Sequence, residues 1–584
     1  MKKTKIVATI GPTSESDEIL RELFLNGLNV CRLNFSHGSH EEHQERIDSI
    51  KRVREDMDLP IAIMLDTKGP EIRLGDFKDG QIQLNQGDEF TLTAREILGD
   101  KEIVSISYKD LAKDVDVGGR ILIDDGLVEL KILEIIDGTD IKCAAVNNGI
   151  LKNHKGVNVP NVKINLPAVT EKDIEDIKFG IKNDVDFLAV SFVRTAEDVI
   201  TIRKILEENG GQSIHIISKV ESQQGVDNLD DIITMSDGIM VARGDLGVEV
   251  KSQEIPLIQK EMIKKCNIAG KPVITATQML DSMMRNPRPT RAEVTDVANA
   301  ILDGSTAIML SGETAAGKYP VDSVKMMYDI AITTERALDY AELLRLRSRQ
   351  TQLTTTNAIG KATCATAADL DAKAIITATS SGHTSRAISK YRPKAPIIAA
   401  TNTEAVRRKL SLEWGVYPVL SRRSQTTDEV IDDSIASAIE GGYVEEGDLV
   451  VITAGVPVGL SGTTNLIKVH SIGKVLLHGA GIGDMVGTGR VCIANNYDEL
   501  ISRFKDGDII VSPATDRDMV GFIKRSSGII AVEGGLTSHA AIVGLNLSKP
   551  TIVGARDALD ILKNGDIITM DSNSGQVYKG ETRV

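Results

Sequence analysis

The sequence predicts an α/β protein built on a (β/α)8 barrel, with an inserted β-barrel-like lid domain, a C-terminal open α/β domain and an appended β/α domain. Three observations lead to this expectation. Short apolar runs alternate with amphipathic helical patterns, the connection from Asp66 to Leu166 is far too long for a loop, and a new alternation begins after Tyr340. At 584 residues the chain also exceeds one core, since domains commonly hold ~100–200 residues.

Eight apolar runs are typical of parallel strands separated by helices: KIVATIGP, NVCRLNFS, PIAIMLDTKG, DFLAVSFV, HIISKVES, GIMVARGD, PVITATQM and STAIMLSGET. Eight consecutive βα units favour a closed barrel, over residues 1–69 and 167–342, rather than an open doubly wound sheet. Helix starts are also visible. Before IEDIKFGIKN, Thr170 is placed to cap a helix and Asp173 to complete a capping box.

Residues 70–166 interrupt this alternation. They carry β-type runs separated by Gly and Asp turns, namely GQIQL, EFTLTA, GRILIDDG, LVELKIL and DIKCAAV. Structureless loops beyond ~15 residues are uncommon in compact domains. We therefore expect a β-rich lid inserted after the third strand of the barrel.

Two further domains are expected after the barrel. Residues 343–472 combine the helix AIGKATCATAADL with the strands AIITATS, PIIAAT and LVVITAG, which predicts an open α/β domain. Residues 473–484 are glycine-rich and are expected to form a linker. A last β/α domain is expected over residues 485–584.

Composition argues against several classes of function. The net charge of −15 repels a nucleic-acid backbone, so no nucleic-acid partner is expected. The MKKTKIVATIGP terminus has too short an apolar run for a signal peptide, and no stretch approaches the ~18 apolar residues of a membrane span. We therefore expect a cytoplasmic protein without membrane contacts. Reduced, structural thiols are expected, without zinc or redox spacing, at Cys31, Cys143, Cys266, Cys364 and Cys492.

Polar side chains collect where the predicted strands end, which is where barrels of this class place their active sites. Five strand ends carry them: Arg32 to His37, Asp66 to Lys68, Lys219 to Glu221, Arg243 to Asp245, and Thr277 with Gln278. Strand side chains alternate between faces, so residues two apart point the same way, about 6–7 Å apart. The pairs expected to do so are Arg32 with Asn34, Lys219 with Glu221, and Arg243 with Asp245.

Glu221 and Asp245 come from adjacent predicted strands, and two converging carboxylates suit a hard cation such as Mg²⁺. Either residue alone is better explained by a salt bridge at the barrel rim, such as Lys219 with Glu221. The clustering at five strand ends favours the metal. The segment RGDLG fits a strand that enters a helix whose free N–H groups bind an anion, or an ordinary turn with an Asp N-cap.

Several segments resemble the signature segments of the pyruvate kinase family, in the family's order. They are NVCRLNFSHG, LDTKGPEIR, ISKVES, MVARGDLGVE, PVITATQMLDSMMRNPRPTRAEVTDVAN and IMLSGETAAGKYP. The resemblance covers about residues 1–472 and implies a catalytic barrel, a lid and an allosteric domain. It further implies phosphoryl transfer from phosphoenolpyruvate to ADP, giving pyruvate and ATP in the last step of glycolysis, and suggests a homotetramer.

The resemblance implies a role for several strand-end residues. Glu221 and Asp245 would bind Mg²⁺ or Mn²⁺, with the substrate completing the coordination. Lys219 and Arg32 would stabilise the phosphoryl group in flight, because fixed cations and metal dominate this chemistry. The groups implied to hold the substrate carboxylate are the backbone N–H groups of Gly244 and Asp245, with Thr277. Thr277 also lies where the enolate is protonated, with water as the expected proton source.

A K⁺ site is implied at Asn34, Ser36, Asp66 and Thr67. Glu71 is the residue type associated with K⁺ dependence in the family, where a lysine would suggest otherwise. The residues implied to face the nucleotide phosphates are Arg73, His37 and Lys155, the last reaching in when the lid closes. For His37, a capping or packing role is an equal alternative.

In the predicted open α/β domain, a run of hydroxyl residues follows a strand and opens a helix, which suits a phosphate. The run is Thr379, Ser380, Ser381, Gly382, His383 and Thr384. It resembles the family's effector-phosphate site, although a hydroxyl-rich N-cap has the same pattern. Among relatives the effector is a sugar phosphate, such as fructose 1,6-bisphosphate or ribose 5-phosphate, or AMP, and the sequence does not choose between them.

Residues from about 485 to 584 depart from the common pattern of the family. Their GGLTSHAA segment resembles the phosphohistidine loop of the swivelling domains in phosphoenolpyruvate-using enzymes such as pyruvate phosphate dikinase. His539 at this turn could accept a phosphoryl group beside helix-terminal N–H groups. Direct transfer to ADP needs no relay, which favours a retained fold whose histidine does not turn over.

Two rival functions follow from the same segments. A phosphoenolpyruvate synthase or dikinase is suggested by GGLTSHAA, but it needs an ATP-grasp domain for which the chain has no room or pattern. A non-catalytic metabolite sensor or phosphocarrier is the other alternative. It gains nothing from retaining the set Arg32, Lys219, Glu221 and Asp245.

Overall fold

The computed structural model describes residues 1–160, 162, 164–423, 426–457, 462–473 and 475–582. Its elements form two compact units. The first unit comprises Met1–Gln352, Ser389–Arg392 and Thr403–Pro418. The second comprises Leu353–Ile388, Pro393–Asn402 and Val419–Val584. Residues 389–418 therefore contribute to both units.

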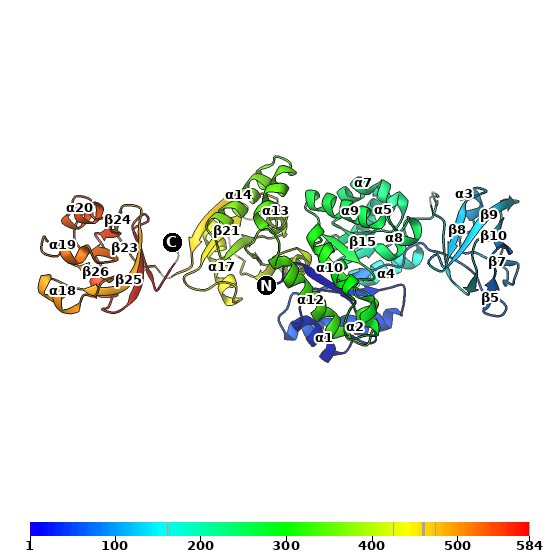
Figure 1. Ribbon diagram of the computed structural model, residues 1–584, viewed down its shortest axis with the longest axis horizontal. Helices are drawn as coiled ribbons and strands as arrows, with labels where there is room; N and C mark the ends of the chain where they lie inside the picture. Colours follow the sequence, from blue (N-terminus) through cyan, green and yellow to red (C-terminus); the bar gives the residue numbers. More distant parts are fainter. Residues whose placement is uncertain (161, 163, 424–425, 458–461, 474, 583–584) are drawn as a thin grey trace. The chain divides into compact units, whose positions relative to one another are not determined.

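In the first unit, eight parallel strands of the described chain close into a barrel, in the ring order β1-β2-β3-β13-β14-β15-β16-β17 (Figure 1). They are β1 (Lys5–Thr9), β2 (Val30–Asn34), β3 (Ala62–Asp66), β13 (Phe187–Val190), β14 (His215–Val220), β15 (Gly238–Ala242), β16 (Val273–Ala276) and β17 (Ala307–Leu310). β1 pairs with both β2 and β17, so the sheet has no edge. The predicted closed barrel is confirmed, and the open doubly wound alternative is wrong.

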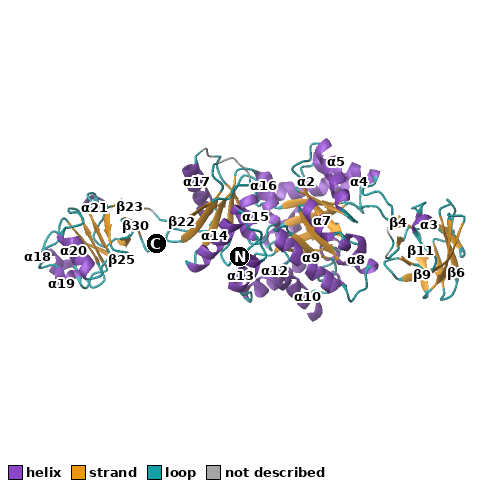
Figure 2. Cartoon of the chain, turned by 90° about the horizontal axis from the view of Figure 1, so that it is seen from above, coloured by secondary structure: helices purple, strands orange, loops and turns teal. Residues whose placement is uncertain are grey.

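Helices surround the barrel strands (Figure 2). They are α1 (Asp17–Leu25), α2 (His40–Asp56), α4 (Glu171–Lys182), α5 (Ala196–Glu208), α6 (Gln223–Asp227), α7 (Leu229–Met235), α8 (Arg243–Glu249), α9 (Ile255–Ala269), α10 (Arg291–Asp303), α11 (Gly312–Ala315), α12 (Pro320–Arg336) and α13 (Tyr340–Arg349), with the 3₁₀ turn η1 (Asp281–Met284). The predicted capping box of α4 is present. Thr170 Oγ1 accepts from the Asp173 N–H (3.1 Å), and Asp173 Oδ2 accepts from the Thr170 N–H (2.9 Å).

Both faces of the barrel strands are buried, which is why the strands read as continuous apolar runs. Alternate residues fill the barrel interior, including Met64, Phe187, Ala189, Ile217 and Met240. The residues between them, such as Ile63 and Ile216, pack outward in the larger core beneath the helices. This alternation leaves the polar residues at the strand ends to face the mouth of the barrel.

The insertion after β3 is a β domain with its own core. Its strands are β4 (Ile72–Arg73), β5 (Gln81–Leu84), β6 (Glu89–Thr93), β7 (Ile103–Ser105), β8 (Arg120–Ile123), β9 (Val128–Ile136), β10 (Asp140–Ala145), β11 (Gly149–Lys152) and β12 (Gly156–Asn158), with the helix α3 (Leu111–Asp114). Seven strands form a sheet in the order β4-β12-β8-β9-β10-β6-β7, and β11 pairs with β5, among the described residues. Alternating burial in β10 is typical of a sheet with one buried face.

A five-stranded sheet of the described chain follows, in the order β20-β19-β18-β21-β22. Its strands are β18 (Ala374–Ala378), β19 (Ile397–Thr401), β20 (Val416–Leu420), β21 (Leu449–Ala454) and β22 (Leu466–Ser471). The helices of this region are α14 (Thr355–Asp369), α15 (His383–Ser389), α16 (Glu404–Lys409) and α17 (Thr427–Glu440), with the 3₁₀ turn η2 (Leu410–Leu412). The strands β18, β19 and β21 are parallel, as an open α/β domain requires.

The C-terminal sheet has the order β23-β30-β29-β25-β26-β27-β28-β24 in the described residues. Its strands are β23 (Val475–His478), β24 (Ala480–Ile482), β25 (Val486–Ile493), β26 (Ile509–Ser512), β27 (Gly528–Ala531), β28 (Thr551–Val553), β29 (Ile567–Asp571) and β30 (Gln576–Lys579). Its helices are α18 (Tyr497–Arg503), α19 (Val520–Ile523), α20 (His539–Asn546) and α21 (Ala558–Ile561).

The expectation of a linker over 473–484 is wrong, because β23 and β24 lie there and pair with β30 and β28. The glycines that suggested flexibility are sites of close backbone approach. A Cβ on Gly481 would lie 1.9 Å from the Ser572 carbonyl oxygen, and one on Gly479 would lie 2.8 Å from the Val553 carbonyl oxygen.

All five cysteines are buried and unbridged, and burial raises the pKa of Cys266 to about 12. The thiols therefore stay protonated, in agreement with the expected structural role. In the described part of the chain, no helix has the length and apolar character needed to cross a membrane.

Candidate active site

Lys219, near the end of β14, is the centre of a buried charge cluster. Its Nζ lies 3.1 Å from Asp66 Oδ1, 3.0 Å from Glu221 Oε1 and 2.8 Å from the Ser191 hydroxyl. Burial opposes the charge of the ammonium, but the carboxylates of Asp66 and Glu221 outweigh it and raise the pKa of Lys219 above its usual value. Lys219 is therefore a fixed cation at the mouth of the barrel.

Arg32 supplies a second fixed cation. Its Nε donates to Asp66 Oδ2 at 2.6 Å and its Nη1 to the Thr9 hydroxyl at 2.8 Å. Asp66 thus lies between Arg32 and Lys219, and its side chain is fully buried. Burial alone would raise the pKa of Asp66, but the two cations hold it below its usual value. Asp66 is ionised and orients both cations.

Glu221 is placed for a different task. Its Oε2 accepts from the backbone N–H of Phe192 at 2.7 Å. Burial raises the pKa of Glu221 to about 8, opposed by Lys219 and reinforced by the charge of Asp245. A carboxylate that is costly to ionise in the absence of a further cation is a suitable metal ligand, because a divalent ion would remove that cost.

Asp245 lies in the first turn of α8, which begins directly after β15. The residue capping this helix is Ala242, which makes no side-chain cap hydrogen bond, so Asp245 is not the N-cap. The expectation that Arg243 and Asp245 point the same way is also wrong. Arg243 is already helical, so strand alternation does not apply, and its guanidinium is bound to Asp296 at 2.7 Å and to the Thr277 carbonyl at 2.7 Å.

Thr277 follows β16 in a left-handed conformation, with φ of 68°, and Gln278 follows with φ of 55°. This conformation is costly for a β-branched residue and marks a position held by its surroundings. The Thr277 hydroxyl accepts from the Gly244 N–H at 2.9 Å and donates to the Ala276 carbonyl at 2.6 Å. Thr277 and the start of α8 are therefore brought together as predicted, and Arg243 fixes the backbone between them.

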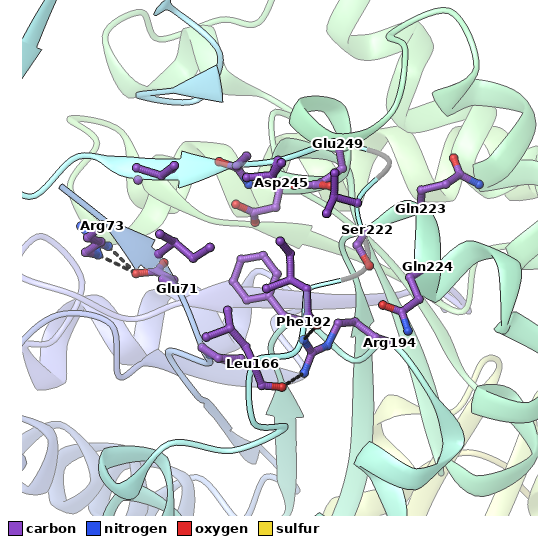
Figure 3. Close-up of a pocket in the computed structure, with 18 of the residues that line it drawn as sticks. Glu71, Arg73, Leu166, Phe192, Arg194, Ser222, Gln223, Gln224, Asp245 and Glu249 are labelled. Carbon is purple, nitrogen blue, oxygen red and sulfur yellow. Dashed lines mark hydrogen bonds and ion pairs between the residues drawn. The ribbon is translucent and has the colours of Figure 1, made fainter. Parts of the chain in front are cut away.

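A pocket of about 640 Å³ lies between the inserted domain and the mouth of the barrel (Figure 3). Asp245 and Phe192 line it, and the Phe192 N–H connects it to Glu221. Six carboxylates and three cationic side chains are among its described lining residues: Glu71, Asp124, Asp125, Asp227, Asp245 and Glu249, against Arg73, Lys155 and Arg194. Burial and the charge of Asp245 raise the pKa of both Asp125 and Glu249. The pocket is short of positive charge for an anionic substrate.

This charge balance fits a divalent cation. Glu221 and Asp245 offer hard oxygen ligands, and in the described part of the chain no group of three or more His, Cys, Asp or Glu side chains is arranged to enclose a metal. Two protein carboxylates leave most of the coordination sphere to substrate and water, as Mg²⁺ prefers. The residues present therefore fit a shared metal rather than a structural one.

The residues expected at a K⁺ site lie around the Lys219 cluster. Asn34 Oδ1 accepts from the Ser36 N–H at 3.1 Å, and the Thr67 carbonyl accepts from the Ser191 hydroxyl at 2.6 Å. Asn34 and Asp66 are paired in register on β2 and β3. Glu71 lies apart from these residues in the inserted domain, where its carboxylate bonds Arg73 at 2.6 Å and lies 3.7 Å from Lys68.

Two of the three expected nucleotide residues line the pocket, namely Arg73 and Lys155. Lys155 is paired with Asp124 at 2.8 Å within the inserted domain. His37 is exposed and is not among the described lining residues. Its carbonyl accepts from the His43 ring at 2.9 Å, which agrees with a role at the start of α2.

Ser191 and Arg194 were missed by the sequence reasoning. Both follow β13, and the run DFLAVSFV carries a polar residue, Ser191, directly after this strand. Ser191 could have been found by that signal. Arg194 has no local signal, because its role depends on the distant chain segment that it binds.

Arg194 fixes the segment of the chain that returns from the inserted domain to the barrel. Its Nη1 donates to the Ile164 carbonyl at 3.0 Å and its Nη2 to the Leu166 carbonyl at 2.7 Å (Figure 3). Asn165, between them, is bound from the other side, its side chain and N–H both donating to Asp114 at 2.9 and 3.0 Å. The hinge of the insertion is thus fixed from both domains, and Arg194 is two residues from Phe192.

Comparison with known proteins decides the family. The model of the pyruvate kinase barrel domain matches residues 1–324. The chain belongs to the pyruvate kinase family. The pyruvate kinase alpha/beta domain matches residues 357–470, and the mobile domain of PEP-utilising enzymes matches residues 504–575.

Proteins named pyruvate kinase align over the full length of this family member. The protein from Sporosarcina psychrophila is 52% identical over 586 residues and that from Bacillus licheniformis 53% identical over 585, with all of both chains covered in each case. A crystal structure of a pyruvate kinase from Cryptosporidium parvum has a TM-score of 0.77 at 43% identity. It covers 80% of this chain and 96% of its own.

The expected effector loop lines a small pocket of about 90 Å³ in the second unit. Gly382, with φ of 81°, makes the turn, and its N–H donates to the Thr379 hydroxyl at 2.9 Å. The Thr384 hydroxyl is 3.0 Å from that of Thr464. Burial and Arg386 lower the pKa of His383, so this side chain is neutral near pH 7. Ser380, Ser381 and Arg422 also line the pocket.

His539 is the first residue of α20, which is capped by the Ser538 hydroxyl accepting from the Ala541 N–H. The imidazole is half-buried, with Nδ1 2.9 Å from the Thr515 hydroxyl. Gly534, with φ of 114°, makes the preceding turn. His539 therefore lies between a glycine turn and the start of a helix, the position on which the resemblance to a phosphohistidine loop rests. Thr515 contacts Nδ1, so Nε2 is the ring nitrogen that this hydroxyl does not contact.

Proposed function

We propose that this chain catalyses the pyruvate kinase reaction, transferring the phosphoryl group of phosphoenolpyruvate to ADP and giving pyruvate and ATP in the last step of glycolysis. One observation carries the proposal: Lys219 is held by Asp66, Glu221 and Ser191 at the mouth of the barrel. The full-length relatives named pyruvate kinase support the same assignment.

Lys219 and Arg32 act on the phosphoryl group. Both cations are positioned by Asp66 before substrate arrives, so no reorganisation is needed as charge spreads over the phosphoryl oxygens. Asp66 keeps the two cations together and, with Glu221, keeps Lys219 protonated. Positive charge is thereby fixed where the transition state needs it.

Glu221 and Asp245 would hold a Mg²⁺ or Mn²⁺ ion, with the substrate completing its coordination. The ion would supply positive charge that offsets the negative charge of the substrate. Glu221 is kept in place by the Phe192 N–H, and its pKa of about 8 favours binding a cation over remaining a bare carboxylate. The excess of carboxylates over cationic side chains in the adjoining pocket also favours binding of a cation.

The substrate carboxylate is held at the start of α8 by the N–H groups of Gly244 and Asp245, with Thr277. The Gly244 N–H donates to the Thr277 hydroxyl in the free protein, so substrate would replace that bond. Thr277 directs a water to the enolate carbon, because an unassisted threonine is a poor acid.

Asn34, Ser36, Asp66 and Thr67 would hold a K⁺ ion next to the Lys219 cluster. The nucleotide phosphates are held by Arg73 and Lys155, which line the pocket. His37, which precedes α2 and lies outside the described lining of the pocket, is the third proposed contact. Closure of the inserted domain brings Lys155 toward the barrel and excludes water.

The family's regulatory features are proposed on the same basis. A phosphorylated effector, either a sugar phosphate or AMP, binds the pocket of residues 379–384 and makes the enzyme allosteric. The enzyme acts in the cytoplasm as a homotetramer, which light scattering tests against four times the 63.1 kDa of one chain. The catalytic barrel comprises 1–69 and 167–342, the lid 70–166, the allosteric domain 343–472, and the appended domain retains the mobile fold without turnover at His539.

The deciding experiment incubates the purified full chain with phosphoenolpyruvate, ADP and Mg²⁺, with and without K⁺, and measures pyruvate and ATP. Equal amounts of both products, increased by K⁺, are expected. Formation of neither product rejects the function in favour of a sensor or carrier. Phosphoenolpyruvate formed from pyruvate, ATP and water, with release of AMP and inorganic phosphate, would support the synthase alternative.

A further inference from the structure

A second polar pocket, of about 310 Å³, lies at the opposite end of the barrel strands from Lys219. It is lined by the end of α2, by the residues that precede β13 and β14, and by α16, all of the first unit. Its charged lining residues are Lys51, Arg54, Glu55, Asp184, Asp186, Arg408 and Lys409. None of the roles proposed for the active site or the effector loop involves these residues.

Two guanidinium groups in this pocket share one carboxylate. Arg408 Nε donates to Asp186 Oδ1 at 2.8 Å, and Arg54 Nη1 lies 4.0 Å from Asp186 Oδ2. The Asp186 carboxylate also accepts from the Ile63 N–H at 2.9 Å. The side chains of Arg54, Asp186 and Arg408 are 8%, 2% and 15% exposed, so two cations and one anion are removed from most of the solvent.

Most of the donors on these two arginines have no protein acceptor. Arg54 bonds the Ile61 carbonyl at 3.0 Å, and Arg408 bonds only Asp186, among the described residues. A guanidinium carries five N–H groups in a rigid fork. The remaining nitrogens of Arg54 and Arg408 are not fully enclosed in the described structure, so they are accessible from the pocket. The repulsion between Arg54 and Arg408 adds to the burial that lowers the pKa of Arg54. The pocket therefore lacks a negatively charged group that could accept hydrogen bonds from these donors.

The other acids of the pocket do not supply it. Glu55 and Asp184 are exposed, so their carboxylates remain hydrated at the rim, whereas Arg54 is buried. Lys51 is half-buried and has no ion-pair partner in the described chain, and Lys409 lines the same pocket. Cations outnumber acids both around the whole pocket and among its buried members.

We propose that this pocket is a binding site for a small phosphate-bearing anion, held by Arg54 and Arg408 with Lys51 at the rim. Guanidinium forks match the oxygens of a phosphate in pairs, which favours this class of oxyanion over a halide. The volume of about 310 Å³ exceeds that of phosphate alone, whose five heavy atoms occupy at most about 150 Å³ if each takes up to the ~30 Å³ of a liquid water. A phosphate monoester with a small polyol group therefore fits as well as inorganic phosphate.

Occupation would connect two parts of the chain that are distant in sequence. Arg54 belongs to α2 of the barrel, and Arg408 belongs to α16, which follows β19 of the five-stranded sheet. The anion would bind both arginines and reduce their repulsion, fastening α16 to the amino ends of β3 and β13. Asp66 and Ser191 lie at the other ends of those two strands.

The site can be tested independently of catalysis by arginine labelling. The full-length protein is treated with phenylglyoxal, and mass spectrometry follows modification of Arg408 as inorganic phosphate or glycerol phosphate is added. Because the reading is taken at one residue, phosphate bound in the active site or the effector loop does not contribute. Saturable protection of Arg408 is expected, and protection at lower concentrations of glycerol phosphate than of inorganic phosphate would identify a monoester site rather than a free-phosphate site.

Two variants locate the protecting anion. Lys51→Met removes a half-buried charge with little risk to folding and should raise the half-protecting concentration roughly 5-fold. Arg54→Gln should raise it roughly 10- to 100-fold, because it removes charge-assisted hydrogen bonds. Lys204→Met, an exposed charge on α5 outside the pocket, is the matched control and should behave as wild type. Absence of protection, or the same curve for Lys51→Met and Lys204→Met, would overturn the proposal.

Discussion

Replacing Lys219 by methionine tests the centre of the proposed active site. The change keeps the length of the side chain and removes a cation that contacts Asp66, Glu221 and Ser191 within 3.1 Å. Because Arg32 is already bound to Asp66 and Thr9, it cannot take over the position of the ammonium. The variant should therefore lose charge stabilisation of the phosphoryl group without losing the rest of the site.

The expected loss is large in rate and small in stability. Removing a fixed cation from a phosphoryl-transfer site costs on the order of 10³–10⁵ in kcat. Breaking a buried ion pair ordinarily costs about 3–5 kcal/mol of stability. Here the cost should be well below that range, because Asp66 keeps Arg32 and Glu221, whose pKa is about 8, takes up a proton at neutral pH instead of remaining an unpaired anion.

The assay measures steady-state formation of pyruvate and ATP together with unfolding in urea. Lys178→Met, an exposed lysine on α4, is the matched control for loss of one positive charge. A kcat within ~10-fold of wild type would refute the role of Lys219 in phosphoryl transfer, since even a single neutral donor in such a site contributes about 10²–10³. If Lys219→Met loses activity because it unfolds, the experiment is repeated with Lys219→Arg, which keeps the charge and alters its geometry. Full activity of Lys219→Arg would also contradict the role of Lys219.

Three further outcomes are expected. Arg194→Met should increase hydrogen exchange in residues 70–166 and raise the KM for ADP, because the carbonyls of Ile164 and Leu166 lose their donors; unchanged exchange would contradict the role of Arg194 at the hinge. Glu71→Lys should reduce the stimulation of activity by K⁺, because a lysine there is the residue type that does not accompany K⁺ dependence, and a K⁺ response equal to that of wild type would count against that site. His539→Ala should leave turnover within about 2-fold of wild type, and a large fall in kcat with unchanged folding would show that the imidazole takes part in turnover.

The barrel was predictable because its signals are local. A continuous apolar run, a polar residue at its end and a capping box such as Thr170 with Asp173 are each contained in a few residues. The same is true of Lys219 and Glu221, since Lys219 is near the end of β14, Glu221 directly follows that strand, and their contact of 3.0 Å joins side chains only two positions apart. Where the strand gives way to a helix, as at Arg243, alternation no longer applies and the expected direction was wrong.

The features that escaped prediction depend on pairing between distant segments. Gly479 and Gly481 suggest a flexible linker by composition, yet they are small because the backbone of another strand approaches them closely. Arg194 acts on carbonyl groups nearly 30 residues before it, and carbonyls leave no trace in a sequence. Asp186 and Arg408 are 222 positions apart, so their pairing is visible only in the fold.

The strands β3 and β13 connect the two charge clusters of the first unit. At their carboxyl ends, Asp66 and Ser191 hold Lys219, and every charge is matched by a close partner. At their amino ends, Arg54 and Arg408 share Asp186 and leave donors without acceptors. Catalysis requires the first cluster to be complete before substrate arrives, because its cations must not move during transfer. A ligand can complete the cluster at the other end of the same strands, because that cluster still has donors without acceptors. A ligand that binds there adds its binding free energy to the free energy of unfolding of the barrel.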